Sequence, residues 1–169
     1  FVGNTMIDTL LANQVQFRAP AFWAKAGLQP GQYFVMTLHR PANVDDSAGF
    51  AKLLRAVGEA VRGLPVVFPV HPRTAKTLAA LPDTPACLRL VDPQPYLEFN
   101  YLVRNARGVI TDSGGVTEET TVMGVPCVTL RDTTERPETV SIGTNELIGT
   151  DPAALKPALD RVVAGQGKK

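Results

Sequence analysis

Short runs of apolar residues, many of them β-branched, alternate along the chain with longer stretches in which apolar residues recur at helical spacing. Most of the short runs are apolar throughout, which is typical of parallel strands whose two faces are both covered by helices. The pattern predicts strands at residues 33–38, 66–70, 88–91, 108–111, 127–130 and 146–148. It predicts helices at residues 4–15, 47–61, 74–81, 96–105, 115–123 and 151–163. This alternation indicates an α/β fold, a three-layer, doubly wound parallel sheet of about six strands.

The composition is that of a globular protein, since 44% of the 169 residues are hydrophobic and 20% are charged. We expect a single domain over residues 1–169. The formal net charge is +1, so no broad electrostatic field attracts a nucleic acid or an anionic membrane, and neither is expected as a partner. An anionic ligand must therefore be bound by a local site.

The two cysteines, Cys87 and Cys127, lie beside apolar residues and lack the spacing of metal ligands. We expect both thiols to be reduced, which favours a cytoplasmic location, and we expect neither a metal ion nor a cofactor. The chain starts at Phe1 rather than at a methionine, within sequence that already favours a helix. This start predicts a piece of a longer protein.

The sequence Thr-Asp-Ser-Gly-Gly at residues 111–115 follows an apolar strand and precedes a predicted helix. Ligands of open parallel sheets lie outside the carboxyl ends of the strands, and a helix N-terminus there offers unpaired N–H groups and a partial positive charge. Ser113, Gly114 and Gly115 are therefore candidates for binding a phosphate. The alternative is an ordinary turn in which Asp112 or Ser113 caps the helix, and spacing alone gives it about half the weight. The motif matches neither a P-loop nor the dinucleotide glycine fingerprint, so it does not name the nucleotide.

Two adjacent glutamates occupy the helix that follows this turn. Glu119 lies about one and a half helical turns beyond Ser113, where its carboxylate can reach back to the hydroxyls of a ribose. Glu118 is rotated by about 100° around the helix, so we expect one of the two to be exposed to solvent. The alternative for both is that they only complement the helix dipole.

The chain contains two histidines, and each directly follows a predicted strand. His39 is a candidate acid or charge stabiliser at one strand end, and His71 occupies the equivalent place after another strand. A histidine taken singly is more often structural than catalytic, by about two to one. The position of both at strand ends, each with an arginine close behind, favours a functional role.

Residues 131–138, with the sequence Arg-Asp-Thr-Thr-Glu-Arg-Pro-Glu, are dense in charge and follow another strand. A guanidinium at this position can clamp a diphosphate with two hydrogen bonds. The alternative is an exposed loop whose charges neutralise one another, which is the commoner outcome for such a run.

Five segments together resemble the non-hydrolysing bacterial UDP-N-acetylglucosamine 2-epimerases; they are residues 3–8, 37–43, 92–99, 111–119 and 131–138. The motifs at 111–115 and 131–138 are the most specific of them. The resemblance implies a Rossmann-like domain that forms one half, the C-terminal half, of a glycosyltransferase-B-type two-domain architecture. It also implies UDP-N-acetylglucosamine and UDP as ligands, a missing N-terminal domain of the same chain, and a homodimeric parent.

The resemblance assigns roles to individual residues on the nucleotide side of the site. Ser113, with the backbone of Gly114 and Gly115, would bind the diphosphate, and Glu119 would bind the ribose. Gln94 and the main chain near Phe99 would bind the uracil.

On the sugar side, the resemblance places Arg136 and His39 beside the phosphate and the sugar, with His39 as the catalytic residue. Arg40 is also among the residues expected to bind substrate. Arg40 and His71 resemble positions that line a neighbouring UDP-sugar site, which regulates some bacterial members. Those members often carry a second arginine and a glutamate after the His-Arg pair, where this chain has Pro41 and Ala42.

The reaction implied is the interconversion of UDP-N-acetylglucosamine and UDP-N-acetylmannosamine by elimination and re-addition of UDP, catalysed by an isomerase. The carboxylates that move the C2 proton belong to the family's first domain, so the isolated chain is expected to be inactive. Alternatives are the donor-binding half of a glycosyltransferase of the same architecture, a hydrolysing epimerase, and a stand-alone UDP-sugar-binding regulatory module. His39 and residues 131–138 favour the epimerase over the glycosyltransferase.

Overall fold

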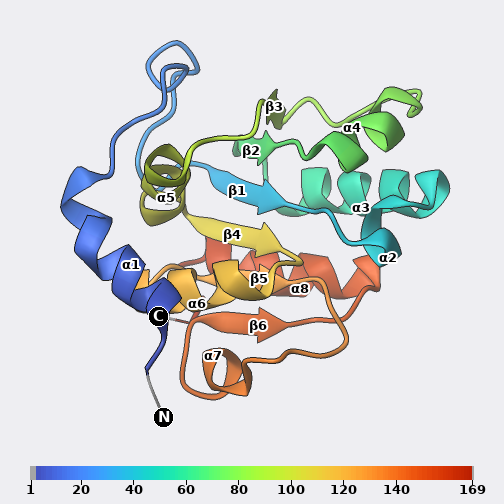
Figure 1. Cartoon of the computed structure of the whole chain (residues 1–169). Coiled ribbons are helices and arrows are strands. Elements are labelled where there is room, and N and C mark those ends of the chain that lie inside the picture. The colour runs from blue at the N-terminus through green and yellow to red at the C-terminus, as the bar shows by residue number, and fades with distance from the viewer. Residues whose placement is uncertain (1–2, 169) are drawn as a thin grey trace.

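The computed structural model describes residues 3–168, and its framework is a six-stranded sheet in which all neighbouring strands are parallel (Figure 1). The strands are β1 (Phe34–Thr37), β2 (Val66–Pro69), β3 (Leu88–Val91), β4 (Gly108–Thr111), β5 (Cys127–Thr129) and β6 (Asn145–Leu147). Their spatial order is β3-β2-β1-β4-β5-β6, the doubly wound order of Rossmann-like folds. The prediction of an α/β parallel sheet is confirmed.

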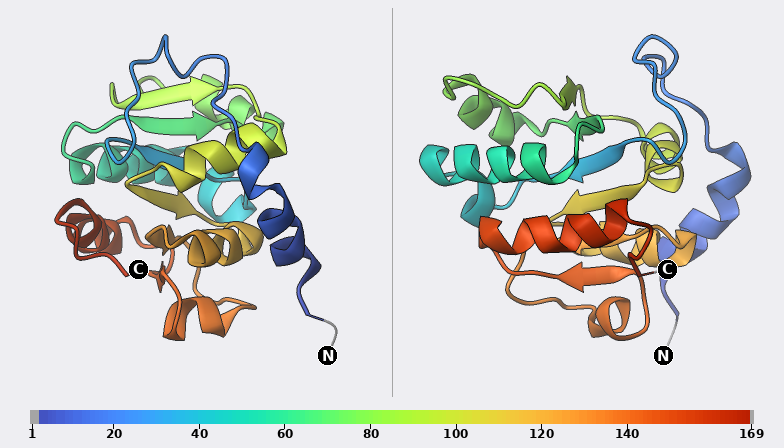
Figure 2. Two further views of the ribbon diagram at one scale, coloured as in Figure 1. Left: turned by 90° about the vertical axis from the view of Figure 1, so that its left-hand side faces the viewer. Right: turned by 180° about the vertical axis from the view of Figure 1, so that it is seen from behind.

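Helices cover both faces of the sheet and complete three layers (Figure 2). They are α1 (Thr5–Asn13), α2 (Pro41–Val44), α3 (Ser47–Ala60), α4 (Pro72–Ala79), α5 (Tyr96–Arg104), α6 (Gly114–Met123), α7 (Pro137–Ser141) and α8 (Pro152–Val163). On one face, α3 and α8 pack against Phe34 and Met36 of β1. On the other face, Val35 packs with side chains of α5 and α6. Successive residues of β1 therefore point into two separate cores, as expected of a strand that is covered on both sides.

The predicted elements begin and end within two residues of their observed bounds, but the pattern does not predict the short helices α2 and α7. Each begins with a proline, Pro41 or Pro137, at its first helical position. Proline suits this position because its missing N–H is not needed there and its φ already matches a helix. A helix of about one turn offers no periodicity to detect. Over residues 3–168, no helix combines the length and the apolar character that a membrane span requires.

The parallel strands bring the segments that follow them to the same edge of the sheet, the edge at the carboxyl ends of the strands. Because all strands are parallel, the segments that follow them emerge together beyond their carboxyl ends (Figure 1). β1 and β4 are neighbours at the centre, and Thr37 of β1 is in register with Thr111 of β4. From this pair the strand order runs outwards in opposite directions, which opens a crevice where ligands of doubly wound sheets bind.

Three aromatic residues anchor the connection that leads into β1. This connection follows α1 and a 3₁₀ turn, η1 (Gln14–Gln16). The ring of Trp23 packs edge-on against Tyr33, with centroids 5.4 Å apart, and against Tyr101 of α5, with centroids 5.2 Å apart. Tyr33 is fully buried, and its hydroxyl donates a hydrogen bond to the carbonyl oxygen of Leu102 at 2.6 Å. The loop before the sheet is thereby fixed to α5.

We expect Tyr33→Phe to lower the free energy of unfolding by about 1 to 2 kcal/mol, because it removes the donor of a buried hydrogen bond and keeps the ring. Tyr101→Phe is the matched control, since in the described part of the chain its hydroxyl makes no hydrogen bond. That control should change the free energy by less than about 0.5 kcal/mol. Urea denaturation of the three proteins measures the difference. Equal losses for both variants would contradict the assigned hydrogen bond.

Candidate functional site

A cavity of about 240 Å³ lies beyond the carboxyl ends of the central strands. Its walls come from the ends of β1 and β2, the β3–α5 connection, α5 and the first turn of α6. Residues predicted for the site that line it are His39, His71, Gln94, Phe99 and Ser113. The structure therefore brings together side chains from four separate stretches of sequence, at the position where a doubly wound sheet binds its ligands.

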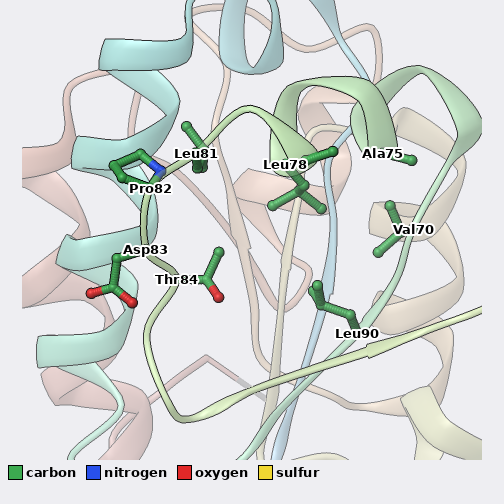
Figure 3. Close-up of a pocket in the computed structure, with 9 residues that line it drawn as sticks. Val70, Ala75, Leu78, Leu81, Pro82, Asp83, Thr84 and Leu90 are labelled. Atoms are coloured by element: carbon green, nitrogen blue, oxygen red, sulfur yellow. The ribbon is translucent and has the colours of Figure 1, made fainter.

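A larger cavity, of about 490 Å³, lies beside α4 and the edge strand β3 (Figure 3). Its lining is mainly aliphatic and includes Leu78, Leu81 and Leu90, while Asp83 and Thr84 provide its polar side chains. Ligand sites combine an apolar lining with several polar groups that converge on the ligand. The smaller cavity at the strand ends fits this description better, and it is the candidate functional site.

Asp112 is fully buried and organises the polar groups behind the cavity. It directly follows Thr111, so it lies beside the residues that leave β1. Its Oδ2 accepts hydrogen bonds from the backbone N–H of Arg40 at 2.9 Å and of His39 at 3.1 Å, and from Nδ2 of Asn43 at 3.1 Å. From the sequence, Asp112 is predicted only as a helix cap. Its partners instead lie about 70 residues earlier, so the helical context gave no signal for them.

His39 is held by the same carboxylate. Its Nδ1 lies 2.9 Å from Oδ1 of Asp112, and 46% of its side chain remains exposed. The His71 ring lies 6.2 Å away between centroids. His71 has a capping role, because its Nδ1 accepts a hydrogen bond from the backbone N–H of Arg73 at the start of α4. The two histidines thus meet at the cavity, one oriented by a carboxylate and the other by a helix N-terminus.

The first turn of α6 lacks a capping side chain. Ser113 occupies the N-cap position, but its side chain makes no capping hydrogen bond, and the carboxylate of Asp112 is occupied by the chain after β1. The predicted alternative, with Asp112 or Ser113 as the N-cap residue, is correct for the position of Ser113, but no capping hydrogen bond from its side chain accompanies it. Without such a cap, the N–H groups of the first turn stay available to an anion, and the helix dipole favours its negative charge.

Arg131 adds a positive charge beside this turn. It follows β5, its side chain is only 9% exposed, and it donates two hydrogen bonds to Glu135, at 2.6 and 2.8 Å. This pairing lowers the pKa of Glu135 to about 2. A Cβ atom built on Gly114 would lie 3.7 Å from Nη1 of Arg131 and 3.5 Å from Oε2 of Glu135. The family resemblance predicts Arg136 from this charged run, whereas Arg131 is the guanidinium that lies against the start of α6.

Arg136 forms an ion pair with Glu118. Its Nε donates to Oε1 of Glu118 at 2.8 Å, and the same oxygen accepts a hydrogen bond from Nδ2 of Asn4 at 2.6 Å. The expectation that either Glu118 or Glu119 is exposed is wrong, because each is only 7% exposed. Segments far away in the sequence cover α6 on more than one side, which its helical periodicity does not reveal. The predicted charge-neutralising loop at residues 131–138 is correct in part, since both of its arginines are paired.

Glu119 is buried on another side of α6, near Tyr96 and Asn100 of α5. Burial raises its pKa, although hydrogen bonds from these two side chains act in the opposite direction. Burial and the neighbouring Glu119 also raise the pKa of Tyr96, to about 12. No salt bridge to Glu119 occurs within residues 3–168. Glu119 is thus a buried carboxylate with a raised pKa and no cation, although it is not among the residues that line the cavity at the strand ends.

The remaining residues predicted for the site each have contacts of their own in the folded chain. Nε of Arg40 donates to the backbone oxygen of Asp112 at 2.9 Å, so its guanidinium is drawn to the turn before α6. Nε2 of Gln94 donates to the carbonyl oxygen of Asp92 at 2.7 Å. Phe99 packs against the core under α5 and α6 and also lines the cavity. Gly115 lies in the first turn of α6, where its backbone passes close to Met6 of α1.

The chain is similar to known proteins in both sequence and structure. The family model described as UDP-N-acetylglucosamine 2-epimerase matches residues 1–169. The chain belongs to the UDP-N-acetylglucosamine 2-epimerase family. It is 36% identical to the UDP-N-acetylglucosamine 2-epimerase of Methanocaldococcus jannaschii, covering 94% of this chain and 46% of that protein. It is 38% identical to the UDP-2,3-diacetamido-2,3-dideoxy-D-glucuronate 2-epimerase of Pseudomonas aeruginosa, covering 88% of this chain and 41% of that protein.

Solved structures agree with this family assignment. The crystal structure of the Methanocaldococcus jannaschii epimerase, in complex with UDP-GlcNAc and UDP, superposes with a TM-score of 0.83 at 36% identity. The match covers 96% of this chain and 47% of that one. The glycosyltransferase VinC in complex with dTDP is similar at a TM-score of 0.62 and 20% identity, which shows a shared fold. The chain spans about half the length of the relatives that it matches.

We expect Glu119→Gln and Glu118→Gln to change the stability of the chain in opposite directions. Because the folded state raises the pKa of Glu119, folding favours its protonated form. That contribution is fully present below the ordinary pKa of 4.5 and is lost as the pH rises through the raised pKa. At neutral pH, Glu119→Gln should therefore raise the free energy of unfolding. Glu118→Gln should lower it, because it weakens the contacts with Arg136 and Asn4.

Urea denaturation at neutral and at acidic pH tests this pair of variants. The stabilisation by Glu119→Gln should shrink as the pH falls below the ordinary glutamate pKa, where the wild-type carboxyl is protonated in both states. A loss of stability in Glu119→Gln at neutral pH would mean that the carboxylate is well compensated in the folded chain. An unchanged Glu118→Gln variant would mean that its ion pair contributes nothing.

Proposed function

We propose that this chain is the UDP-binding domain of a UDP-N-acetylglucosamine 2-epimerase, an isomerase that interconverts UDP-N-acetylglucosamine and UDP-N-acetylmannosamine. The observation that carries this proposal is the uncapped N-terminus of α6 beside the buried Arg131, at the central crevice of the sheet. Family membership supports the same conclusion. The chain spans about half of its relatives, so we further propose that a parent protein supplies an N-terminal domain across the cleft.

The diphosphate of the ligand fits the first turn of α6. Gly114 leaves the backbone open there, and the N–H groups of the turn have no capping side chain. Arg131 supplies a guanidinium that can clamp phosphate oxygens in pairs. In the free chain this guanidinium is neutralised by Glu135, whose side chain is 61% exposed. The exposed glutamate can turn away when a more highly charged anion arrives, while the buried arginine stays in place.

The nucleoside part of UDP fits the α5 side of the cavity. Gln94 and Phe99 line it and are proposed to contact the uracil. Glu119 is proposed to accept hydrogen bonds from the ribose hydroxyls, which would provide donors for a buried carboxylate that has no cation. Arg136 is proposed to bind the phosphate groups. To do so, its guanidinium must either break its hydrogen bond to Glu118 or keep that bond and contact the phosphate with another nitrogen. Arg40 and His71 remain predictions for a regulatory subsite.

In the proposed reaction, the proton at C2 is removed and UDP departs from C1. A proton is then delivered to the opposite face of C2, and UDP adds back at C1. The weakly acidic C2 proton needs a general base, and the departing diphosphate needs positive charge. This chain provides the second requirement through α6 and Arg131, and His39 is proposed to act at the sugar side. The carboxylate at the back of the cavity, Asp112, already accepts hydrogen bonds from several donors. The family resemblance places the carboxylates that move the C2 proton in the first domain, so we propose that the C2 base belongs to the N-terminal domain of the parent.

A second candidate concerns the sugar rather than the nucleotide. The similarity to the Pseudomonas aeruginosa epimerase supports a UDP-2,3-diacetamido sugar acid as an alternative substrate. Both candidates share UDP and a reaction at C2, so the groups described for this chain serve either one. Assays of the parent with both UDP-sugars would separate them. A homodimeric parent and a cytoplasmic location remain predictions.

We expect Gly114→Ala to weaken UDP binding without reducing stability. An added methyl group would lie at ordinary contact distances of 3.5 and 3.7 Å from its neighbours, and alanine suits a helix better than glycine. The same methyl group would stand where a diphosphate approaches the backbone. Loss of a charge-assisted hydrogen bond predicts a decrease in affinity of about tenfold or more.

Calorimetric titration of the chain with UDP measures this decrease, with UMP and ATP as competing probes. Val122→Ala, at the exposed far end of α6, is the matched control and should bind UDP as the wild type does. Wild-type chain should bind UDP saturably and more tightly than UMP or ATP. No saturable response to UDP would refute the proposed function, and equal affinity for ATP would reduce the site to a general phosphate site.

We expect the chain alone to catalyse no exchange at C2. In deuterated water with UDP-N-acetylglucosamine, the purified chain should incorporate no more deuterium at C2 than a sample without protein, because the proposed general base belongs to another domain. Nuclear magnetic resonance of the sugar detects the exchange. Exchange above the blank would show that a base within this chain reaches the substrate.

A further inference from the structure

We propose that Asp112 is the positioning residue of His39, and that its carboxylate sets which ring nitrogen of His39 carries the proton. Nδ1 of His39 lies 2.9 Å from Oδ1 of Asp112, which is hydrogen-bond distance. An ionised carboxylate only accepts hydrogen bonds, so the contact requires a proton on Nδ1. In the neutral imidazole the lone pair is then on Nε2, for which residues 3–168 provide no hydrogen-bond partner, on a half-exposed ring that lines the cavity.

The surroundings of Asp112 make this assignment specific. All groups within hydrogen-bond distance of its carboxylate are nitrogen donors: two backbone N–H groups, the Asn43 amide and the imidazole. The Asn43 amide also donates to the carbonyl oxygen of Leu130 at 3.1 Å, which fixes its orientation. The two backbone N–H groups and the fixed Asn43 amide cannot become acceptors, so the carboxylate must accept hydrogen bonds. The residue is also fully buried, so water does not replace these bonds.

Asp112 also fixes where His39 stands relative to the anion-binding turn. It directly precedes Ser113, the N-cap residue of α6. Its backbone oxygen accepts a hydrogen bond from Nε of Arg40, and its carboxylate binds the backbone of the segment that carries His39. The imidazole and the start of α6 are therefore joined through one residue. The chemical use of Nε2 on a UDP-sugar rests on the proposed function, whereas the tautomer does not.

An Asp112→Asn variant should invert this tautomer. Three donors converge on the Oδ2 position, so the single carbonyl oxygen of the asparagine is drawn there. Its amide N–H then faces Nδ1 of His39, which must accept a hydrogen bond. The proton moves to Nε2, and the nitrogen at the cavity changes from an acceptor into a donor while the ring stays in place.

Long-range ¹H–¹⁵N correlation spectra of the ¹⁵N-labelled chain measure the tautomers directly. The chain has only two histidines, so a His71→Gln variant assigns both signals. His71 is an internal reference of the opposite kind, because its Nδ1 accepts a hydrogen bond from the backbone of Arg73 and its proton must lie on Nε2. At a pH where both rings are neutral, we expect the Nδ1–H form for His39 and the Nε2–H form for His71.

In Asp112→Asn we expect His39 to adopt the Nε2–H form. A wild-type His39 in the Nε2–H form, or a variant that keeps the Nδ1–H form, would overturn the proposal. If the variant does not fold, the wild-type spectrum still decides. In the parent, the variant should lose turnover on the order of 100-fold while its UDP affinity stays within about twofold. A chain with the expected tautomer that fails to bind UDP would refute the proposed function and leave this inference intact.

Discussion

The parallel pairing of β1 with β4 at the centre of the sheet is the constraint on which the rest of the site depends. The two strands are in register from Phe34 and Gly108 to Thr37 and Thr111, so the chain leaves both at the same height. Side chains after β1 and β4 must then meet, although they are more than 70 residues apart in sequence. The strand order diverges from this pair, and the crevice that results receives the N-terminus of α6. The position of an anion site thus follows from topology before any particular side chain is considered.

Charge compensation explains how this edge of the sheet stays folded while it carries so many ionisable groups. Burying a charge is costly unless partners replace the water that it loses. Asp112 has nitrogen donors around its carboxylate, Arg131 has Glu135, and Glu118 has Arg136 and Asn4. Glu119 is the exception, because burial raises its pKa and no salt bridge within residues 3–168 offsets the cost. Under the proposed function, the ribose hydroxyls of the ligand would supply the donors that this carboxylate lacks.

Much of the fold could be predicted from the pattern of residues, whereas several contacts of the site could not. The mainly apolar runs at β1, β2 and β4 identify buried parallel strands, because each strand is covered on both faces. The same reasoning brings His39, His71 and Ser113 to one edge of the sheet, and all three line one cavity, whereas Arg40 and Arg136 are not among its lining residues. It fails for Glu118, whose partner Asn4 lies 114 positions earlier in the chain, and for Arg131, whose place beside Gly114 depends on strand order. It also fails for Asp112. The local sequence is the same whether this residue caps the next helix or accepts hydrogen bonds from residues far away in the chain. These contacts arise from tertiary packing, which the local periodicity of a sequence does not reveal.

The fold alone does not determine the reaction, as the similarity to a glycosyltransferase at 20% identity illustrates. The reaction depends on which side chains at the crevice still have a donor or acceptor atom that can contact a ligand. In the described part of the chain, the carboxylates of Asp112, Glu118 and Glu135 accept hydrogen bonds or pair with cations, and Glu119 is a buried carboxylate without a cation. His39 is different, since one nitrogen is held by a buried carboxylate and the ring is half exposed at the cavity. Under the proposed function, this domain holds the leaving group and presents one imidazole to it. Under the same proposal, the base on the opposite face of the sugar comes from a second domain, and catalysis then requires that domain to close over the cleft.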